Sequence, residues 1–380
     1  MRDPQLREAA PTVPFLDLGL LHRALKAEIV DEFADLVETS AFINGSQVRE
    51  FEEAFARYCG TRHCVGLASG LDALRLGLQA AEIERGDEVV VAASTFVATL
   101  EAVTQAGGRP IVVDATDEDY NLDPAAVEAA LTERTRFLMP THLYGQLADM
   151  RALTELAERH GLIVIEDACQ AHGASRDGIA AGTAGLASGF SFYPGKNLGA
   201  FGDAGALVTD EDRLAAVVRS LREHGQTRKY VHELQGWTAR LDTIQAIVLL
   251  RKLPSLNGWN RERRALAAAY GERLAGTGGL RLPPVPEGSE PVWHIYAVRT
   301  ADPDGLAGFL RERGIGTGRH YPQPVHLTAA YRWLGHRLGE FPVAEALAAE
   351  QLSLPMFPGM TEQQVAAVVE AIADYFARGR

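Results

Sequence analysis

The sequence predicts an α/β protein built on a mainly parallel β-sheet. Between Cys64 and Asp210, short runs rich in Val, Ile and Leu alternate with segments of helical spacing. The runs lack polar alternation, as expected of strands that are covered on both faces. Alternation of strand and helix is typical of α/β domains with parallel strands. We therefore expect a seven-stranded, mainly parallel sheet.

The expected strands are the seven apolar runs at 63–68, 88–93, 109–114, 136–142, 162–166, 189–193 and 205–209. The segments with helical spacing between the first five runs are 72–81, 95–106, 124–131 and 150–159. After Asp167 the alternation stops, because the next twenty or so residues offer turn residues but little room for a long helix. We therefore expect some of the later strands to pair differently from the earlier ones.

The pattern changes again after Asp242. Helices are expected at 243–253, ending at Pro254, and at 261–274, followed by a Pro/Gly-rich loop at 277–291. A strand at 293–300 and a helix at 303–313 come next, and Thr361–Gln364 matches the capping box that starts a final helix. These elements predict a large α/β domain over residues 1–250 and a smaller α+β domain over residues 251–380.

The composition excludes several classes of protein. With 380 residues, of which 47% are hydrophobic, the chain can bury a large core and needs no disulfide framework. Its net charge of −13 argues against binding to nucleic acid, which depends on Lys and Arg. Three cysteines without a Cys-x-x-Cys pair indicate no zinc site. The N-terminus has no signal-peptide pattern and no apolar run is long enough to span a membrane, so we expect a cytoplasmic protein.

Lys196 is a candidate catalytic residue because of the segment around it. The only other ionisable side chains between residues 188 and 208 are those of Tyr193 and Asp203. Lysines are almost never fully buried without a partner. Two interpretations follow: the amine reaches solvent from a glycine-rich turn, or it is desolvated, has a lowered pKa and can form a Schiff base. The segment is not a P-loop, since Asn197 stands where a Ser or Thr would bind Mg²⁺.

Three further features complete a possible site for pyridoxal phosphate. Asp167 ends an apolar strand and either caps a turn or faces the pyridinium nitrogen of this cofactor, which needs a carboxylate partner. Ser69–Asp72 opens a helix and forms either a plain junction or an anion site, to which Ser191 could add a hydroxyl. Phe96 either stacks on a flat ring or belongs to the core.

The chain resembles the DegT/DnrJ/EryC1/StrS family of nucleotide-sugar aminotransferases, from Pro14 to the last helix. The resemblance rests on SGLDAL (69–74), STFVAT (94–99), HLYGQ (142–146), EDACQAHGA (166–174), SFYPGKNLGAFGDAG (191–205), RLDTIQA (240–246) and GTGRHYPQPVHL (316–327). It implies the architecture of fold-type I aminotransferases that depend on pyridoxal phosphate. It also implies a homodimer with active sites at the subunit interface.

The resemblance assigns roles by motif. Lys196 would be the catalytic residue that forms the Schiff base, and Asp167 would pair with the pyridinium nitrogen. The other cofactor contacts would come from Gly70, Leu71, Phe96, Gln170, Ser191 and Thr238. Thr238 stands where the family's G-x-N-x-R segment has an Asn that reaches the phosphate of the neighbouring subunit. The candidates for binding the substrate and its diphosphate are Arg228, Lys229, Arg240, Arg319, His320 and Tyr321.

The implied reaction transfers an amino group from L-glutamate to a nucleotide-linked keto sugar. Gly70-Leu71 resembles the enzymes that act on 3-keto-6-deoxyhexoses, whereas many relatives have Gly-Thr there, so we expect a dTDP-3-keto-6-deoxyhexose. Alternatives are a 4-keto sugar, a UDP or GDP carrier, and a keto-inositol. A sugar dehydratase of this family would carry His in place of Lys196. A non-catalytic binding protein would not need to keep Lys196, Asp167, Gln170 and Ser191 together.

Overall fold

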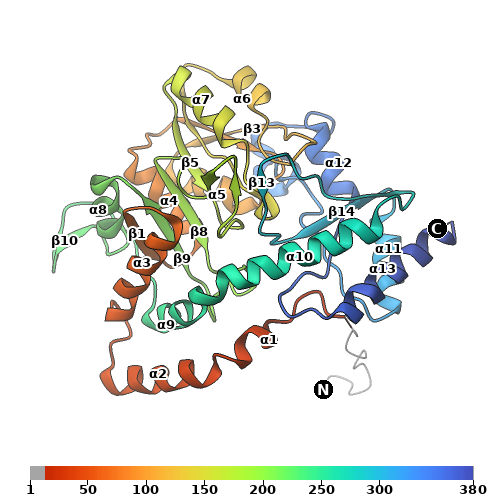
Figure 1. Cartoon of the computed structure of the whole chain (residues 1–380). Coiled ribbons are helices and arrows are strands. Elements are labelled where there is room, and N and C mark those ends of the chain that lie inside the picture. The colour runs from red at the N-terminus through yellow and green to blue at the C-terminus, as the bar shows by residue number, and fades with distance from the viewer. Residues whose placement is uncertain (1–12, 380) are drawn as a thin grey trace, which may run out of the picture.

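The seven predicted strands form one sheet. The computed structural model describes residues 13–379 and gives the strand order β1-β9-β8-β5-β4-β2-β3 (Figure 1). The bounds are β1 His63–Leu67, β2 Glu88–Ala92, β3 Arg109–Val113, β4 Thr135–Leu138, β5 Ile163–Asp167, β8 Ala187–Ser191 and β9 Gly205–Thr209. β9 runs antiparallel to β1 and β8, and the remaining neighbours are parallel. The mainly parallel sheet and the different pairing of a late strand are confirmed.

Helices cover both faces of this sheet. Successive side chains of a strand enter opposite cores: in β2, Val89 and Val91 join one core, and Val90 and Ala92 join the other. The first core is closed by α4 (Gly70–Ala80), α5 (Val97–Ala106) and α8 (Asp212–Leu221). The second is closed by α3 (Ser46–Cys59), α6 (Pro124–Ala130), α7 (Met150–His160) and α9 (Thr243–Lys252). Burial on both faces explains why the strands lack polar alternation.

The C-terminal part has a core of its own. Helices α10 (Leu256–Leu274), α11 (Pro303–Glu312) and α13 (Glu362–Ala377) surround a three-stranded antiparallel sheet of β12 (Leu280–Arg281), β14 (Tyr296–Thr300) and β15 (Gln351–Leu354). The predicted capping box is present at the start of α13. α10 starts five residues before the predicted helix, and the long helix crosses the lower half of Figure 1.

The expected loop at 277–291 is partly strand. It contains β12 and also β13 (Ser289–Glu290), which pairs with β6 (Ser175–Arg176), while β6 pairs in turn with β7 (Ile179–Ala180). These strands have two residues each, too short for a hydrophobic pattern to indicate them.

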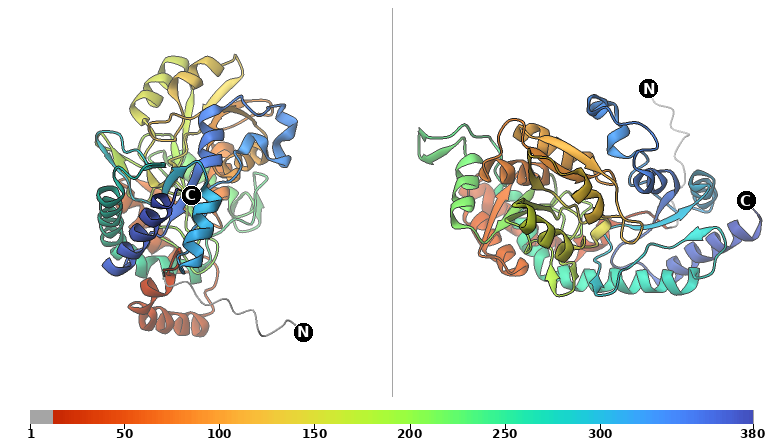
Figure 2. Two further views of the ribbon diagram at one scale, coloured as in Figure 1. Left: turned by 90° about the vertical axis from the view of Figure 1, so that its right-hand side faces the viewer. Right: turned by 90° about the horizontal axis from the view of Figure 1, so that it is seen from above.

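Several segments were not expected from the sequence, among them the N-terminal helices and a hairpin. The helices α1 (Leu18–Arg23) and α2 (Lys26–Thr39) precede α3, and α2 packs on α9. The hairpin of β10 (Gln226–Arg228) and β11 (Val231–His232) projects from one end of the molecule (Figure 2). Its turn places Tyr230 at a φ of 65°, a position where Asn or Gly usually signals a hairpin.

The proposed boundary at residue 250 stays a prediction. Val13 packs in the core of the C-terminal part, whereas Val325, Tyr331 and Ala344 pack in a core of the seven-stranded sheet. Residues 1–12, where no signal peptide is expected, lie outside the described residues. Within residues 13–379, no helix combines the length and apolar character needed to cross a membrane.

Candidate active site

A cavity of about 600 Å³ lies at the carboxyl ends of β1, β5 and β8. Ligands of α/β sheets bind at this edge. Seven of the eight predicted catalytic and cofactor-binding residues line it: Gly70, Leu71, Phe96, Asp167, Gln170, Ser191 and Lys196. The fold therefore brings together residues from four separate motifs.

Lys196 and Asp167 share this cavity. Asp167 is the last residue of β5 and is 5% exposed, and Lys196 follows β8 in a turn. Burial lowers the pKa of the Lys196 amine, and the nearby Cys169 and Asp167 only partly oppose this effect. A lowered pKa favours the neutral, nucleophilic amine. The geometry thus favours the desolvated lysine over one that reaches solvent from a turn.

Buried hydrogen bonds fix the turn that carries Lys196. The side-chain Nδ2 of Asn197 donates to Asn260 Oδ1 at 3.0 Å and to the Val292 carbonyl at 2.8 Å. The buried Lys252 amine donates to the Gly199 carbonyl at the end of the turn. Because Asn260 and Lys252 belong to α10 and α9, these helices hold the lysine in place.

The start of α4 forms an anion cradle, made of Ser69, Gly70, Leu71 and Ser191. The Ser69 hydroxyl accepts the Asp72 N–H at 3.0 Å and caps the helix. A Cβ on Gly70 would lie 2.7 Å from both Cys169 Sγ and Ser191 Cβ. Only glycine allows this approach, which leaves the first turn of α4 facing the cavity. The positive end of a helix dipole there suits an anion.

Phe96 presents an exposed aromatic ring to the cavity. Its side chain is 46% exposed and lies against Tyr321, with 5.1 Å between ring centroids. Gln170 Nε2 donates to the Tyr321 hydroxyl at 3.3 Å, and Gln170 Oε1 accepts the Tyr144 N–H at 2.8 Å. A large ring exposed in a cavity is available to stack on a flat ligand.

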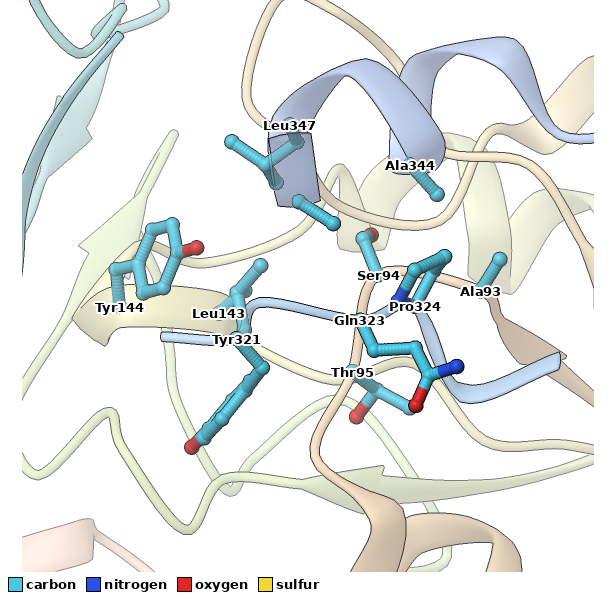
Figure 3. Close-up of a pocket in the computed structure, with 11 residues that line it drawn as sticks. Ala93, Ser94, Thr95, Leu143, Tyr144, Tyr321, Gln323, Pro324, Ala344 and Leu347 are labelled. Atoms are coloured by element: carbon cyan, nitrogen blue, oxygen red, sulfur yellow. The ribbon is translucent and has the colours of Figure 1, made fainter. Parts of the chain in front are cut away.

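A second, much smaller pocket adjoins Tyr321 (Figure 3). It lies between α12 (Pro342–Glu350), which contributes Ala344 and Leu347, and the segments that carry Thr95 and Pro324. Its volume of about 10 Å³ is near the minimum for one water molecule. This pocket is therefore too small to hold a sugar substrate.

Of the six predicted substrate-binding residues, His320 and Tyr321 line the cavity. His320 was expected to supply positive charge to a diphosphate, but burial and the charge of Lys196 lower its pKa to about 4. Its Nδ1 lies 2.9 Å from Ser353 Oγ. Burial therefore disfavours the charged form of His320, and its predicted contact with the diphosphate stays a prediction.

The other predicted substrate residues and Thr238 do not line the cavity of their own chain. Arg228 and Lys229 are exposed on the β10–β11 hairpin. Arg240 pairs with Glu223 at 2.8 Å, and Arg319 pairs with Asp304 at 2.7 Å.

Thr238 is exposed, and its Oγ1 lies 3.2 Å from His224 Nε2. It takes part in no contact with the anion cradle of its own chain that the structure describes. Its predicted contact, like those of Arg228 and Lys229, therefore needs a second chain and stays a prediction.

Arg263 and His294 also line the cavity, although no sequence pattern predicted it. Arg263 is 2% exposed, and its Nη1 donates to the carbonyls of Trp293 and Met356, each at 2.9 Å. Burial and the charges of Lys196 and Arg263 lower the pKa of His294 well below its usual value. Arg263 belongs to the run RERR, which is typical of a solvated helix face, and only tertiary contacts bury it.

Comparison with known proteins gives a consistent result. A model of the DegT/DnrJ/EryC1/StrS aminotransferase family matches residues 23–373. Over 372 residues, 98% of each chain, the protein is 45% identical to dTDP-3-amino-3,4,6-trideoxy-alpha-D-glucose transaminase of Streptomyces venezuelae. It is 41% identical to the UDP-N-acetyl-3-dehydro-alpha-D-glucosamine 3-aminotransferase of Acidithiobacillus ferrooxidans, over 95% of this chain and 97% of the other.

A solved structure agrees with these relatives. The crystal structure of S. venezuelae DesV in complex with a ketimine intermediate matches with a TM-score of 0.94 and 46% identity, over 96% of this chain and 99% of that one. The expected fold-type I architecture is thereby confirmed. The chain belongs to the DegT/DnrJ/EryC1/StrS aminotransferase family and is a sugar aminotransferase that depends on pyridoxal phosphate.

Proposed function

We propose that the protein transfers an amino group from L-glutamate to a dTDP-linked 3-keto-6-deoxyhexose. The observation that carries the proposal is the amine of Lys196, desolvated and in the same cavity as the Asp167 carboxylate. An amine of lowered pKa can form a Schiff base and later exchange protons near neutral pH.

The residues of the cavity fit pyridoxal phosphate. Its phosphate suits the anion cradle, where a Cβ on Gly70 would remove the available space. Asp167 supplies the carboxylate for the ring nitrogen, and Phe96 offers a face to the ring. Gln170 is placed to contact the ring hydroxyl. A volume of about 600 Å³ leaves room for a sugar beside the cofactor.

Lys196 and Asp167 have different roles in the proposed reaction: Lys196 transfers protons, and Asp167 contacts the ring nitrogen of the cofactor. When bound, pyridoxal phosphate stores the amino group and delocalises the electrons left at a deprotonated carbon. Lys196 Nζ, once released by the incoming amine, removes the proton from the α-carbon of L-glutamate as a general base. In the second half of the reaction Lys196 returns a proton to the sugar carbon that receives the nitrogen. Asp167 keeps a negative charge at the ring nitrogen throughout.

Two observations support a 3-keto substrate. The names of both relatives put the reacting nitrogen on C3, of a dTDP sugar in one and of a UDP sugar in the other. Gly70-Leu71 in the anion cradle also matches the pattern expected for 3-keto-6-deoxyhexoses. The dTDP carrier is preferred because the dTDP-sugar enzyme is the more similar of the two.

We further infer a homodimer in which each subunit completes the other's site. A diphosphate needs cations, yet Arg228 and Lys229 are exposed on a hairpin away from their own cavity. Thr238 is likewise exposed outside its own site. A second copy could bring all three residues to the substrate and the phosphate, as the family resemblance implies.

Gly70→Ala tests the anion cradle. We expect the substitution to weaken binding of pyridoxal phosphate by about tenfold or more, because the added methyl group displaces Cys169 and Ser191. Equilibrium dialysis of the apoenzyme measures this constant. Gly271→Ala is the matched control, since its Cβ meets no atom within 4 Å in α10. Equal affinity in both variants would contradict the assignment.

The substrate is tested with purified protein and paired sugars. With L-glutamate as donor, we expect amination of dTDP-3-keto-6-deoxyhexose to exceed that of the 4-keto isomer and of the UDP-linked 3-keto sugar by at least about tenfold in kcat/KM. Mass spectrometry of the product measures each rate. If only 4-keto sugars are aminated, the proposed substrate is wrong.

Shared active sites are tested by mixing inactive variants. Lys196→Ala loses the catalytic amine, and Arg228→Ala/Lys229→Ala loses the hairpin cations. After subunit exchange, half of the dimers contain one intact site of two, so we expect recovery of about a quarter of the wild-type activity. A mixture that stays inactive although native mass spectrometry shows mixed dimers would argue for sites built from single chains.

A further inference from the structure

Three threonines form a hydrogen-bonded cluster next to the carboxylate of Asp167. Thr95, Thr99 and Thr141, here called the threonine triad, are each at most 4% exposed. Thr99 Oγ1 donates to Asp167 Oδ2 at 2.7 Å, and Thr141 Oγ1 donates to the same oxygen at 3.4 Å. Thr95 Oγ1 lies 2.7 Å from Thr99 Oγ1 and 2.9 Å from Thr141 Oγ1.

The hydrogen-bond count fixes the direction of this network. Each hydroxyl has one proton to donate, and an ionised carboxylate only accepts. Thr99 donates its proton to Asp167, and Thr95 donates to Thr99. The proton of Thr141 is then shared between Thr95 at 2.9 Å and Asp167 at 3.4 Å. The chain of donors therefore points from Thr95 toward the carboxylate and strengthens the last bond through polarisation.

The other oxygen of Asp167 is held separately. Oδ1 accepts the Cys169 backbone N–H at 3.2 Å. Thr99 also lies in the first turn of α5, which has no side-chain cap, so its free N–H groups add a positive potential near the carboxylate. Both oxygens of the Asp167 carboxylate are therefore held by hydrogen bonds from the protein.

Packing alone does not account for the triad. Valine has nearly the shape of threonine, and burying a hydroxyl costs free energy unless it is hydrogen-bonded. Three buried hydroxyls at one carboxylate therefore indicate a polar role. Thr95 and Thr99 both belong to the STFVAT segment (94–99). In this segment Phe96 and Ala98 line the cavity, and Phe96 is the predicted ligand contact.

We propose that Thr99, supported by Thr95 and Thr141, is a positioning residue that fixes the Asp167 carboxylate toward the ring nitrogen of the cofactor. The proposal rests on the proposed role of Asp167. Without the triad, the carboxylate would be held less firmly against the ring nitrogen, and that nitrogen would carry less positive charge. Less positive charge on the ring would also raise the pH at which the Schiff-base nitrogen of Lys196 loses its proton.

Thr99→Val tests the proposal on the holoenzyme, and Thr99→Ser restores the hydroxyl. For the valine variant we expect the dissociation constant of the cofactor to rise by about tenfold, because a hydrogen bond to a charged group is lost. We also expect a rise in the pH midpoint of the change in visible absorbance that accompanies loss of the Schiff-base proton. The serine variant should match the wild type in both measurements. Thr104→Val on the same helix is the control, because Thr104 bonds only carbonyls of its own helix and the Tyr331 hydroxyl.

The outcomes separate this proposal from the one on which it rests. If Asp167→Asn loses the cofactor or shifts the midpoint while Thr99→Val behaves like the wild type, the triad proposal is overturned and the role of Asp167 stands. If Asp167→Asn also behaves like the wild type, the role of Asp167 fails. Should Thr99→Val not fold, Thr141→Val is expected to give smaller shifts in the same directions, and their absence there overturns the proposal.

Discussion

The parallel pairing of β5 with β8 is the constraint on which the site depends. Their register puts Asp167 opposite Gly189, so the carboxylate lies two residues below Ser191 on the adjacent strand. The turn with Lys196 follows directly from β8. Gly189 is itself required, because a Cβ there would lie 2.8 Å from Leu74 Cδ2 in α4. One register thus sets the positions of the amine, the carboxylate and the anion cradle relative to one another.

Burial gives these groups their chemical character. Two buried histidines lie near the Lys196 amine, and burial and the charge of Lys196 lower the pKa of His172 to about 3 and that of His294 well below its usual value. Both rings are therefore neutral at pH 7 and do not add charge next to the amine. The same desolvation that lowers the pKa of Lys196 would strengthen its interactions with a bound anion. At Asp167 the threonine triad donates hydrogen bonds that hold the carboxylate in place.

The strands of the sheet and the convergence of the cofactor-site residues could be predicted from the sequence, because they follow from local periodicity and motif spacing. The seven strands are continuous apolar runs because the sheet is buried on both faces, and the motif residues converge because parallel strands end at one edge. The burial of Arg263 could not be predicted, since it depends on carbonyls of Trp293 and Met356, distant in the chain. The lowered pKa of His320 depends on burial in the same way. The position of Arg228 depends on a hairpin without a turn signal, and its proposed role requires a second subunit.

The identity of the reacting amine can be measured directly, because the chain has only four lysines: Lys26, Lys196, Lys229 and Lys252. Lys252 is the informative competitor, since it is also buried and its pKa is lowered to about 8, yet it does not line the cavity. Borohydride reduction of the holoenzyme followed by peptide mass spectrometry locates the trapped cofactor. A single adduct on Lys196, absent from Lys196→Ala, is the predicted result. An adduct on Lys252 or another residue, or none at all, would contradict it.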